Sequence, residues 1–194
     1  MNEGKDEAQQ KENSGRGVVR EIIEIGKILL VSLAIVLPIR YFNVQPFIVR
    51  GASMEPNFHD GQYLIVDEVT YDVRKPARGE VIVFHYPRDP SQFFIKRIIG
   101  LPNERVEIQK GRVTIFNGEN KNGMLLDEQY LKPPNRATYP DKTVTLTGSE
   151  YFLMGDNRDF SSDSRFWGPM DIKFMVGRTL FRAWPLNSAG FVTQ

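Results

Sequence analysis

The chain has 194 residues and a formal net charge of +1, from 25 Lys and Arg against 24 Asp and Glu. This length suits one domain, or one domain with an insert, and the even charge balance gives no sign of a nucleic-acid-binding surface. Because the chain contains no cysteine, thiol catalysis, thiolate metal sites and disulfide bonds are excluded.

The N-terminal part divides into a polar tail and an apolar segment. Residues 1–21 are rich in Glu, Lys, Gln and Gly, which predicts a solvated, poorly ordered tail. Residues 22–42 are mostly apolar and match the length of about 20 residues that a membrane-spanning helix needs. The charged residues Glu24, Lys27 and Arg40 lie near the ends of this segment, where long side chains reach the interface.

We predict that this segment is an uncleaved membrane anchor, because no small residues of a cleavage site follow the apolar run. Basic residues precede the run, which predicts a cytoplasmic N-terminus and a main domain on the outer face. A buried core helix of a soluble protein is the alternative.

From residue 43 to residue 194, short β-type runs alternate with Gly and Pro turns. This pattern predicts a mainly β, mostly antiparallel domain. A loop-rich insert is expected at about 103–148, and Lys110-Gly111 within it predicts a tight hairpin. The expected strands are 62–67, 80–85, 93–99, 105–108, 112–116, 143–146, 151–154 and 173–183.

Ser53 is the candidate nucleophile. It lies in the sequence Gly-Ala-Ser-Met-Glu-Pro, which reads as a turn with small residues before the serine. Small neighbours let a substrate backbone approach closely, and the Ser53 N–H could bind an oxyanion. A serine hydroxyl is a poor nucleophile until a neighbouring base takes its proton, so a base is required.

Lys96 is the candidate for that base. In a strand, Lys96 and Arg97 point to opposite faces among apolar residues, so periodicity does not choose between them. Their chemistry differs, because arginine stays protonated whereas a buried lysine can lose its proton. A triad with His59 or His85 is the alternative, since triads assemble from distant positions.

A third segment, near the C-terminus, is densely polar. Asp163 and Arg165 could form a fixed ion pair, and Ser161 could orient a lysine amine by a hydrogen bond. The rival interpretation is a calcium loop, because Asp156, Asp159 and Asp163 supply oxygens. The segment lacks the ligand order and the glycine of an EF-hand loop, which argues against calcium.

Together these segments resemble the bacterial type I signal peptidases, also called leader peptidases. Ser53-Met54-Glu55-Pro56 is similar to the family's Ser-Met-x-Pro, residues 95–102 to its lysine box, and residues 155–165 to its C-terminal box. The resemblance implies a catalytic domain of two antiparallel sheets on the outer face of the membrane. It also implies hydrolysis that releases exported proteins from signal peptides after an Ala-x-Ala pattern.

The resemblance assigns roles to single residues. Ser53 would attack the scissile carbonyl, and neutral Lys96 would take its proton and later activate the hydrolytic water. Ser161 would position the Lys96 amine, and Asp163 and Arg165 would brace the site. Ser53 and Lys96 are thus the expected catalytic residues, and the other three are the expected supporting residues.

The substrate side chains are small, so shallow apolar pockets are expected. The candidate lining residues flank the two catalytic residues and are Phe47, Val49, Met54, Phe94 and Ile95. We expect signal peptides of exported preproteins and membrane lipid as partners, a monomer, no nucleic acid, no cofactor and no metal.

Two positions depart from the family pattern. Gly51 stands where some members carry a serine whose hydroxyl helps bind the oxyanion, so the oxyanion hole would depend more on backbone N–H groups. Phe160 replaces a common asparagine and could join Phe166 and Trp167 in an apolar patch touching lipid.

Two other protein classes remain as alternatives. A self-cleaving repressor is soluble, and the apolar segment argues against it. An inactive anchored binding protein would not need a lysine among apolar residues.

Overall fold

The computed structural model describes residues 21, 23–34, 44–133 and 137–192, and the chain divides into the units Met1–Asn43 and Val44–Gln194. In the first unit, residues 21 and 23–34 are helical. Within the described residues, no helix combines the length and the apolarity that a membrane crossing requires. The predicted anchor includes residues 22 and 35–42, which lie outside the described residues.

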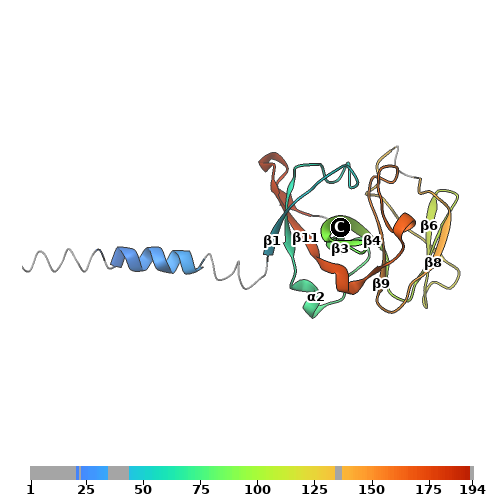
Figure 1. Cartoon of the computed structure of the whole chain (residues 1–194), viewed down its shortest axis with the longest axis horizontal. Helices are drawn as coiled ribbons and strands as arrows, with labels where there is room; N and C mark the ends of the chain where they lie inside the picture. The colour runs from blue at the N-terminus through green and yellow to red at the C-terminus, as the bar shows by residue number, and fades with distance from the viewer. Residues whose placement is uncertain (1–20, 22, 35–43, 134–136, 193–194) are drawn as a thin grey trace, which may run out of the picture. The chain divides into compact units, whose positions relative to one another are not determined.

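The second unit is built from two antiparallel sheets (Figure 1). The larger sheet has the order β1-β2-β11-β3-β4-β9-β10, with β12 pairing to β11, and the smaller has the order β7-β6-β5-β8. The larger sheet consists of β1 (Val44–Ile48), β2 (Tyr63–Asp67), β3 (Val81–Tyr86), β4 (Asp89–Gly100), β9 (Glu150–Met154), β10 (Met170–Asp171), β11 (Met175–Trp184) and β12 (Gly190–Phe191). The smaller sheet consists of β5 (Arg105–Gln109), β6 (Arg112–Phe116), β7 (Met124–Leu125) and β8 (Lys142–Thr145). The prediction of a mainly β fold with two antiparallel sheets is confirmed.

Short helical turns connect the strands. They are α2 (Thr70–Val73), α3 (Ser164–Trp167), η1 (Ile172–Phe174) and η2 (Leu186–Ser188). The run expected from residue 173 therefore starts with η1, and its strand begins at Met175. The smaller sheet is made by residues of the predicted loop-rich insert, in which β7 was not expected.

The hairpin between β5 and β6 turns at Lys110 and Gly111, as the sequence predicts. Both residues have positive φ, 51° and 77°, which is the backbone geometry of a type I′ turn. The flanking residues Gln109 and Arg112 are paired in register. The turn chemistry therefore fixes the local register of the smaller sheet.

The core has one layer on each face of β4 and β9. Ile98 packs with Ile82, Phe84 and Leu153, whereas Ile99 packs with the inner face of the smaller sheet. Successive residues of a strand point to opposite faces, so this end of β4 is covered on both sides. A charged side chain at this end of β4 therefore lies inside the protein and is shielded from water.

Candidate active site

The loop between β1 and β2 carries Ser53 and is fixed at several points. The Val49 N–H donates to the Gln62 carbonyl at 2.9 Å and closes the base of the loop. Met54 and Phe58 are fully buried, and the Phe58 N–H donates to the Met54 carbonyl at 2.9 Å. Ser53 thus directly precedes a turn, residues 54–58, that packs into the core. The backbone of Ser53 therefore has a defined position.

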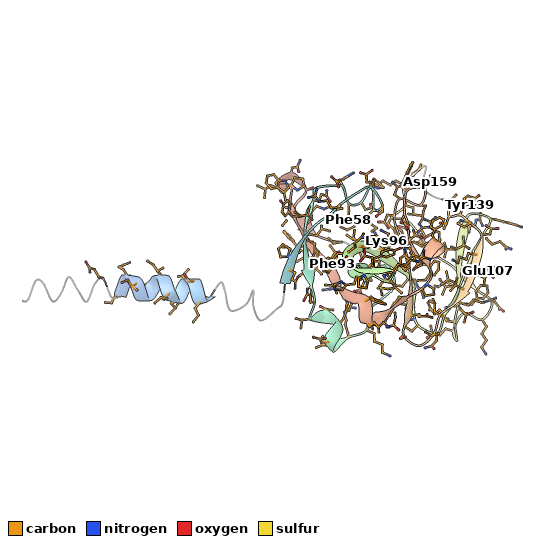
Figure 2. All side chains as sticks on the ribbon, viewed as in Figure 1. Phe58, Phe93, Lys96, Glu107, Tyr139 and Asp159 are labelled. Atoms are coloured by element: carbon orange, nitrogen blue, oxygen red, sulfur yellow. The ribbon has the colours of Figure 1, made fainter. Side chains whose placement is uncertain are left out.

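Lys96, on β4, points its amine at this serine. Its side chain lies inside the β-rich unit (Figure 2), and the residue is 3% exposed. The Lys96 Nζ donates to Ser53 Oγ at 2.8 Å and to the Ile95 carbonyl at 2.9 Å. The structure therefore brings together two candidate residues that are 43 positions apart.

The pKa of Lys96 is lowered to about 8 from its ordinary value of 10.5. Burial is the main cause, because an ammonium loses its hydration in the protein interior. The charges of Asp163 and Asp156 act in the opposite direction and limit the decrease. A substantial neutral fraction is therefore present near pH 8, and a neutral amine can accept the hydroxyl proton.

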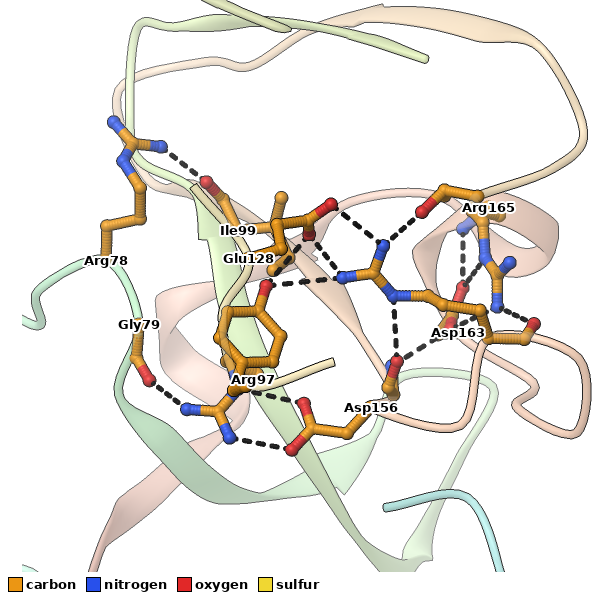
Figure 3. Close-up of polar contacts among 12 residues, drawn as sticks. Arg78, Gly79, Arg97, Ile99, Glu128, Asp156, Asp163 and Arg165 are labelled. Carbon is orange, nitrogen blue, oxygen red and sulfur yellow. Dashed lines mark hydrogen bonds and ion pairs between the residues drawn. The ribbon is translucent and has the colours of Figure 1, made fainter. Parts of the chain in front are cut away.

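The expected pair of Asp163 and Arg165 is present and fully buried. Arg165 donates through Nε and Nη2 to the two carboxylate oxygens of Asp163, both at 2.8 Å. Asp163 also accepts from the Gly155 N–H at 3.0 Å. Arg165 reaches further, donating to the carbonyls of Tyr139 and Arg158 at 2.7 Å. The pair thus ties the start of the polar segment to its end (Figure 3).

A second buried ion pair was not predicted. Arg97 donates through Nε and Nη2 to Asp156 at 2.8 and 2.6 Å, and both side chains are almost fully buried (Figure 3). Asp156 also accepts from Asn57 Nδ2 at 2.8 Å, and Asn57 is in the Ser53 loop. Asp156 therefore connects the strand of Lys96 with the loop of Ser53. The only signal in the sequence was an arginine in an apolar strand, which needs a buried partner.

Asn157 holds the Ser53 loop from the other side. Its N–H donates to the Ser53 carbonyl at 3.1 Å, and its Nδ2 donates to the Ala52 carbonyl at 3.0 Å. Sequence reasoning gave Asn157 no role, because a contact across 105 positions leaves no local pattern. The polar segment therefore fixes the serine through the backbone.

Ser161 is buried near these groups, but its hydroxyl makes no hydrogen bond to any described residue. A Cβ atom at Gly155 would overlap both Ser161 Oγ and the Ser53 carbonyl oxygen, so the three residues are in close contact. The expected hydrogen bond from Ser161 to the Lys96 amine is not formed in this structure. Its positioning role stays a prediction.

A cavity of about 460 Å³ opens beside Ser53 and Lys96. Four of the five predicted pocket residues line it, namely Phe47, Val49, Phe94 and Ile95. Met54 was predicted wrongly, since it is fully buried and packs with Phe58 and Leu64 in the core. The remaining lining residues are Ile48, Arg50, Leu64, Val83, Gln92, Phe93 and Ser162.

The histidine alternative finds no support in the geometry. His59 Nδ1 lies 3.6 Å from Glu55, and His85 Nδ1 lies 2.7 Å from the Pro90 carbonyl. In the described part of the chain, no group of three His, Cys, Asp or Glu side chains is arranged to hold a metal ion.

The three aromatic residues predicted to form a patch differ in their exposure. Phe160 and Phe166 are 76% and 59% exposed. Trp167 instead packs on Phe84 in the core, with ring centroids 5.9 Å apart. The prediction was wrong for Trp167, because α3 turns this side chain inward.

A serine hydroxyl that contacts a buried lysine amine beside a cavity is an arrangement suited to acyl transfer, as in a serine peptidase. The family model described as "Signal peptidase, peptidase S26" matches residues 22–184. The chain therefore belongs to the signal peptidase family, peptidase S26.

Two relatives with 33 and 34% identity agree with this membership. "Probable signal peptidase I-2" of Synechocystis is 34% identical over 89% of this chain and 78% of its own length. "Signal peptidase I" of Pseudomonas aeruginosa is 33% identical over 80% of this chain and 68% of its own length. A crystal structure of a signal peptidase I from Enterococcus faecalis V583 is 33% identical, covers 55% of this chain and 97% of its own, and has a TM-score of 0.46.

Proposed function

We propose that this chain is a membrane-anchored endopeptidase that removes signal peptides from exported preproteins, with Ser53 as nucleophile and neutral Lys96 as base. The observation that carries the proposal is the 2.8 Å contact between Lys96 Nζ and Ser53 Oγ, made by a buried lysine. Because this amine also has a lowered pKa, the proton can pass directly from the hydroxyl to the amine.

The reaction has two acyl-transfer steps. Ser53 Oγ attacks the scissile carbonyl while Lys96 Nζ takes the hydroxyl proton, and this proton then goes to the leaving amine of the mature protein. An acyl-enzyme ester remains on Ser53. Lys96 next takes a proton from a water molecule, whose oxygen attacks the ester carbon. The bond to Ser53 Oγ then breaks, the proton passes from Lys96 back to Ser53 Oγ, and the signal peptide leaves with a new C-terminal carboxyl group. The Ser53 N–H is our candidate donor to the oxyanion, since Gly51 has no hydroxyl to contribute.

The cavity beside Ser53 would bind the small side chains of an Ala-x-Ala site. In an extended peptide, side chains at alternate positions point to the same face. The two alanines would therefore enter the cavity together, against Phe47, Val49, Phe94 and Ile95. Larger side chains would meet these apolar groups, so small residues are favoured.

The proposed membrane attachment depends on residues 22–42, a mostly apolar segment in the sequence. We place the N-terminus in the cytoplasm and the β-rich unit on the outer face of the cytoplasmic membrane, as a monomer. Removal of residues 1–43 should release the protein from the membrane fraction of cells. Retention of the shortened chain in that fraction would contradict the anchor.

The test of the chemistry uses the purified full chain in detergent and a preprotein with an Ala-x-Ala site. We expect cleavage after that site, abolished by Ser53→Ala and by Lys96→Ala. Lys96→Arg should also be inactive, because the charge stays but no base remains. His59→Gln serves as the control and should keep near-wild-type activity. Near-wild-type cleavage by Lys96→Arg would refute the role of Lys96.

A further inference from the structure

The segment that follows β7 lies against the polar segment of the active site, and a buried arginine joins them. Arg158 is 3% exposed and donates through Nη2 to Glu128 and Tyr130 and through Nη1 to Thr138. The Tyr130 hydroxyl in turn donates to Glu128 at 2.9 Å. Glu128 supplies the negative charge of this cluster (Figure 3).

Among the partners of the buried Arg158 guanidinium in this cluster, Glu128 is the one that carries the opposite charge. Burial acts to lower the pKa of Arg158, but Glu128, Tyr130 and Asp156 together outweigh it and the pKa is raised, with Glu128 as the largest of these opposing contributions. The side chain of Glu128 is 11% exposed, so both members of the pair are shielded from water. Loss of this carboxylate would leave a cation without its main counter-charge inside the protein.

Arg158 also contacts the polar segment of the active site, through Nε and through its backbone carbonyl. Its Nε donates to the Gly155 carbonyl at 3.1 Å, and its own carbonyl accepts from Arg165 at 2.7 Å. Gly155 is in close contact with the Ser53 carbonyl, where even a Cβ atom would not fit. A shift of Arg158 would therefore displace the Gly155 backbone and, through it, the Ser53 carbonyl that Gly155 contacts.

The same segment makes a second connection to the serine loop. The Tyr130 carbonyl accepts from Asn57 Nδ2 at 3.0 Å, and the Tyr130 ring lies under the Arg97 guanidinium at 4.1 Å. Arg97 is the neighbour of Lys96 on β4. Residues 128–130 thus contact both the strand of the base and the loop of the nucleophile.

From these contacts we propose that Glu128 is a positioning residue for the Ser53–Lys96 pair, acting through Arg158 and the Gly155 carbonyl. The inference rests on the proposed function of that pair. It gives the predicted loop-rich insert a role in the reaction. Glu128 does not line the cavity beside Ser53, so it sets the geometry of the reacting groups and leaves substrate binding alone.

The experiment compares Glu128→Gln with Glu104→Gln in the purified full chain, by steady-state cleavage of a peptide with an Ala-x-Ala site and by thermal unfolding. Glu104 is the matched control, because it is 5% exposed and accepts from Arg78 Nη2 at 2.7 and 2.9 Å. Its other partners, Leu101 and Asn117, are also outside the polar segment. Both variants remove one shielded carboxylate from an arginine.

We expect Glu128→Gln to lower kcat at least tenfold with KM changed less than twofold, whereas Glu104→Gln keeps kcat within twofold at a similar loss of Tm. If Glu128→Gln does not fold, the double variant Glu128→Gln/Arg158→Met removes the unpaired charge and should fold with the same loss of kcat. The proposal is overturned if kcat is kept in either Glu128 variant, or if Glu104→Gln loses as much. Ser53→Ala, measured in parallel, tests the proposed function separately.

Discussion

Replacement of Lys96 by methionine should make the protein more stable at neutral pH while it abolishes activity. Methionine has a similar length and volume but no charge to bury. Lys96 is almost fully buried, and its pKa falls from 10.5 to about 8 on folding. At about 1.4 kcal/mol per pKa unit, the buried ammonium costs the folded state about 3 kcal/mol.

The sign of the pH dependence follows from proton linkage. Between pH 8 and 10.5 the unfolded chain binds the Lys96 proton and the folded chain does not, so the stability of the wild type rises with pH across that window. Below pH 8 both states are protonated and the full cost applies. The variant loses two hydrogen bonds of Nζ, each worth about 1 kcal/mol. The net gain at neutral pH is therefore about 1 kcal/mol.

The assay is denaturant unfolding of both proteins, followed by tryptophan fluorescence, at neutral pH and near pH 10.5. We expect the advantage of Lys96→Met to shrink by about 3 kcal/mol between these conditions, because the wild type no longer buries a charge. Groups other than Lys96 titrate equally in both proteins and cancel in the difference. A variant less stable than the wild type at neutral pH, or a pH-independent difference, would refute the reasoning.

Two further predictions concern the same site. The kcat for signal peptide cleavage should rise with pH through about 8, the pKa of Lys96, because only the neutral amine accepts the Ser53 proton; a kcat profile that is flat down to acidic pH would argue against a lysine base. Asp163→Asn should destabilise the protein by about 3 to 5 kcal/mol in denaturant unfolding, since Arg165 would stay buried without its counter-charge. A loss below about 1 kcal/mol is the value expected for a solvent-exposed ion pair, and it would contradict the argument that Arg165 needs this buried counter-charge.

Much of the fold could be predicted from local patterns. Alternation of apolar residues located the principal strands, and Lys110-Gly111 specified the turn of one hairpin. The five-residue strand β1 was missed, and so were β7, β10 and β12, whose two residues each give no periodicity to detect. Met54 shows the corresponding limit for the site. Its place beside Ser53 suggested the cavity, but its side chain turns into the core with Phe58.

The partners of the buried charges could not be predicted. The sequence shows that Arg97 lies in an apolar strand, and physical chemistry then requires a counter-charge. It does not show that the counter-charge is Asp156, which is 59 positions away. Glu128 and Arg158 are likewise 30 positions apart, in segments of different character. Such pairs form where two segments meet in the folded chain, so no local sequence pattern predicts them.

The sequence alone determined the chemical candidates and the tertiary structure decided how they meet. Ser53 was identified by its turn, and Lys96 by the need for a base that can lose its proton. Their contact exists because the loop after β1 is anchored over β4, and the pKa of Lys96 is lowered because both faces of that strand are covered. Residue types set which proton transfers are possible, whereas distance and burial depend on long-range packing that only the folded chain defines.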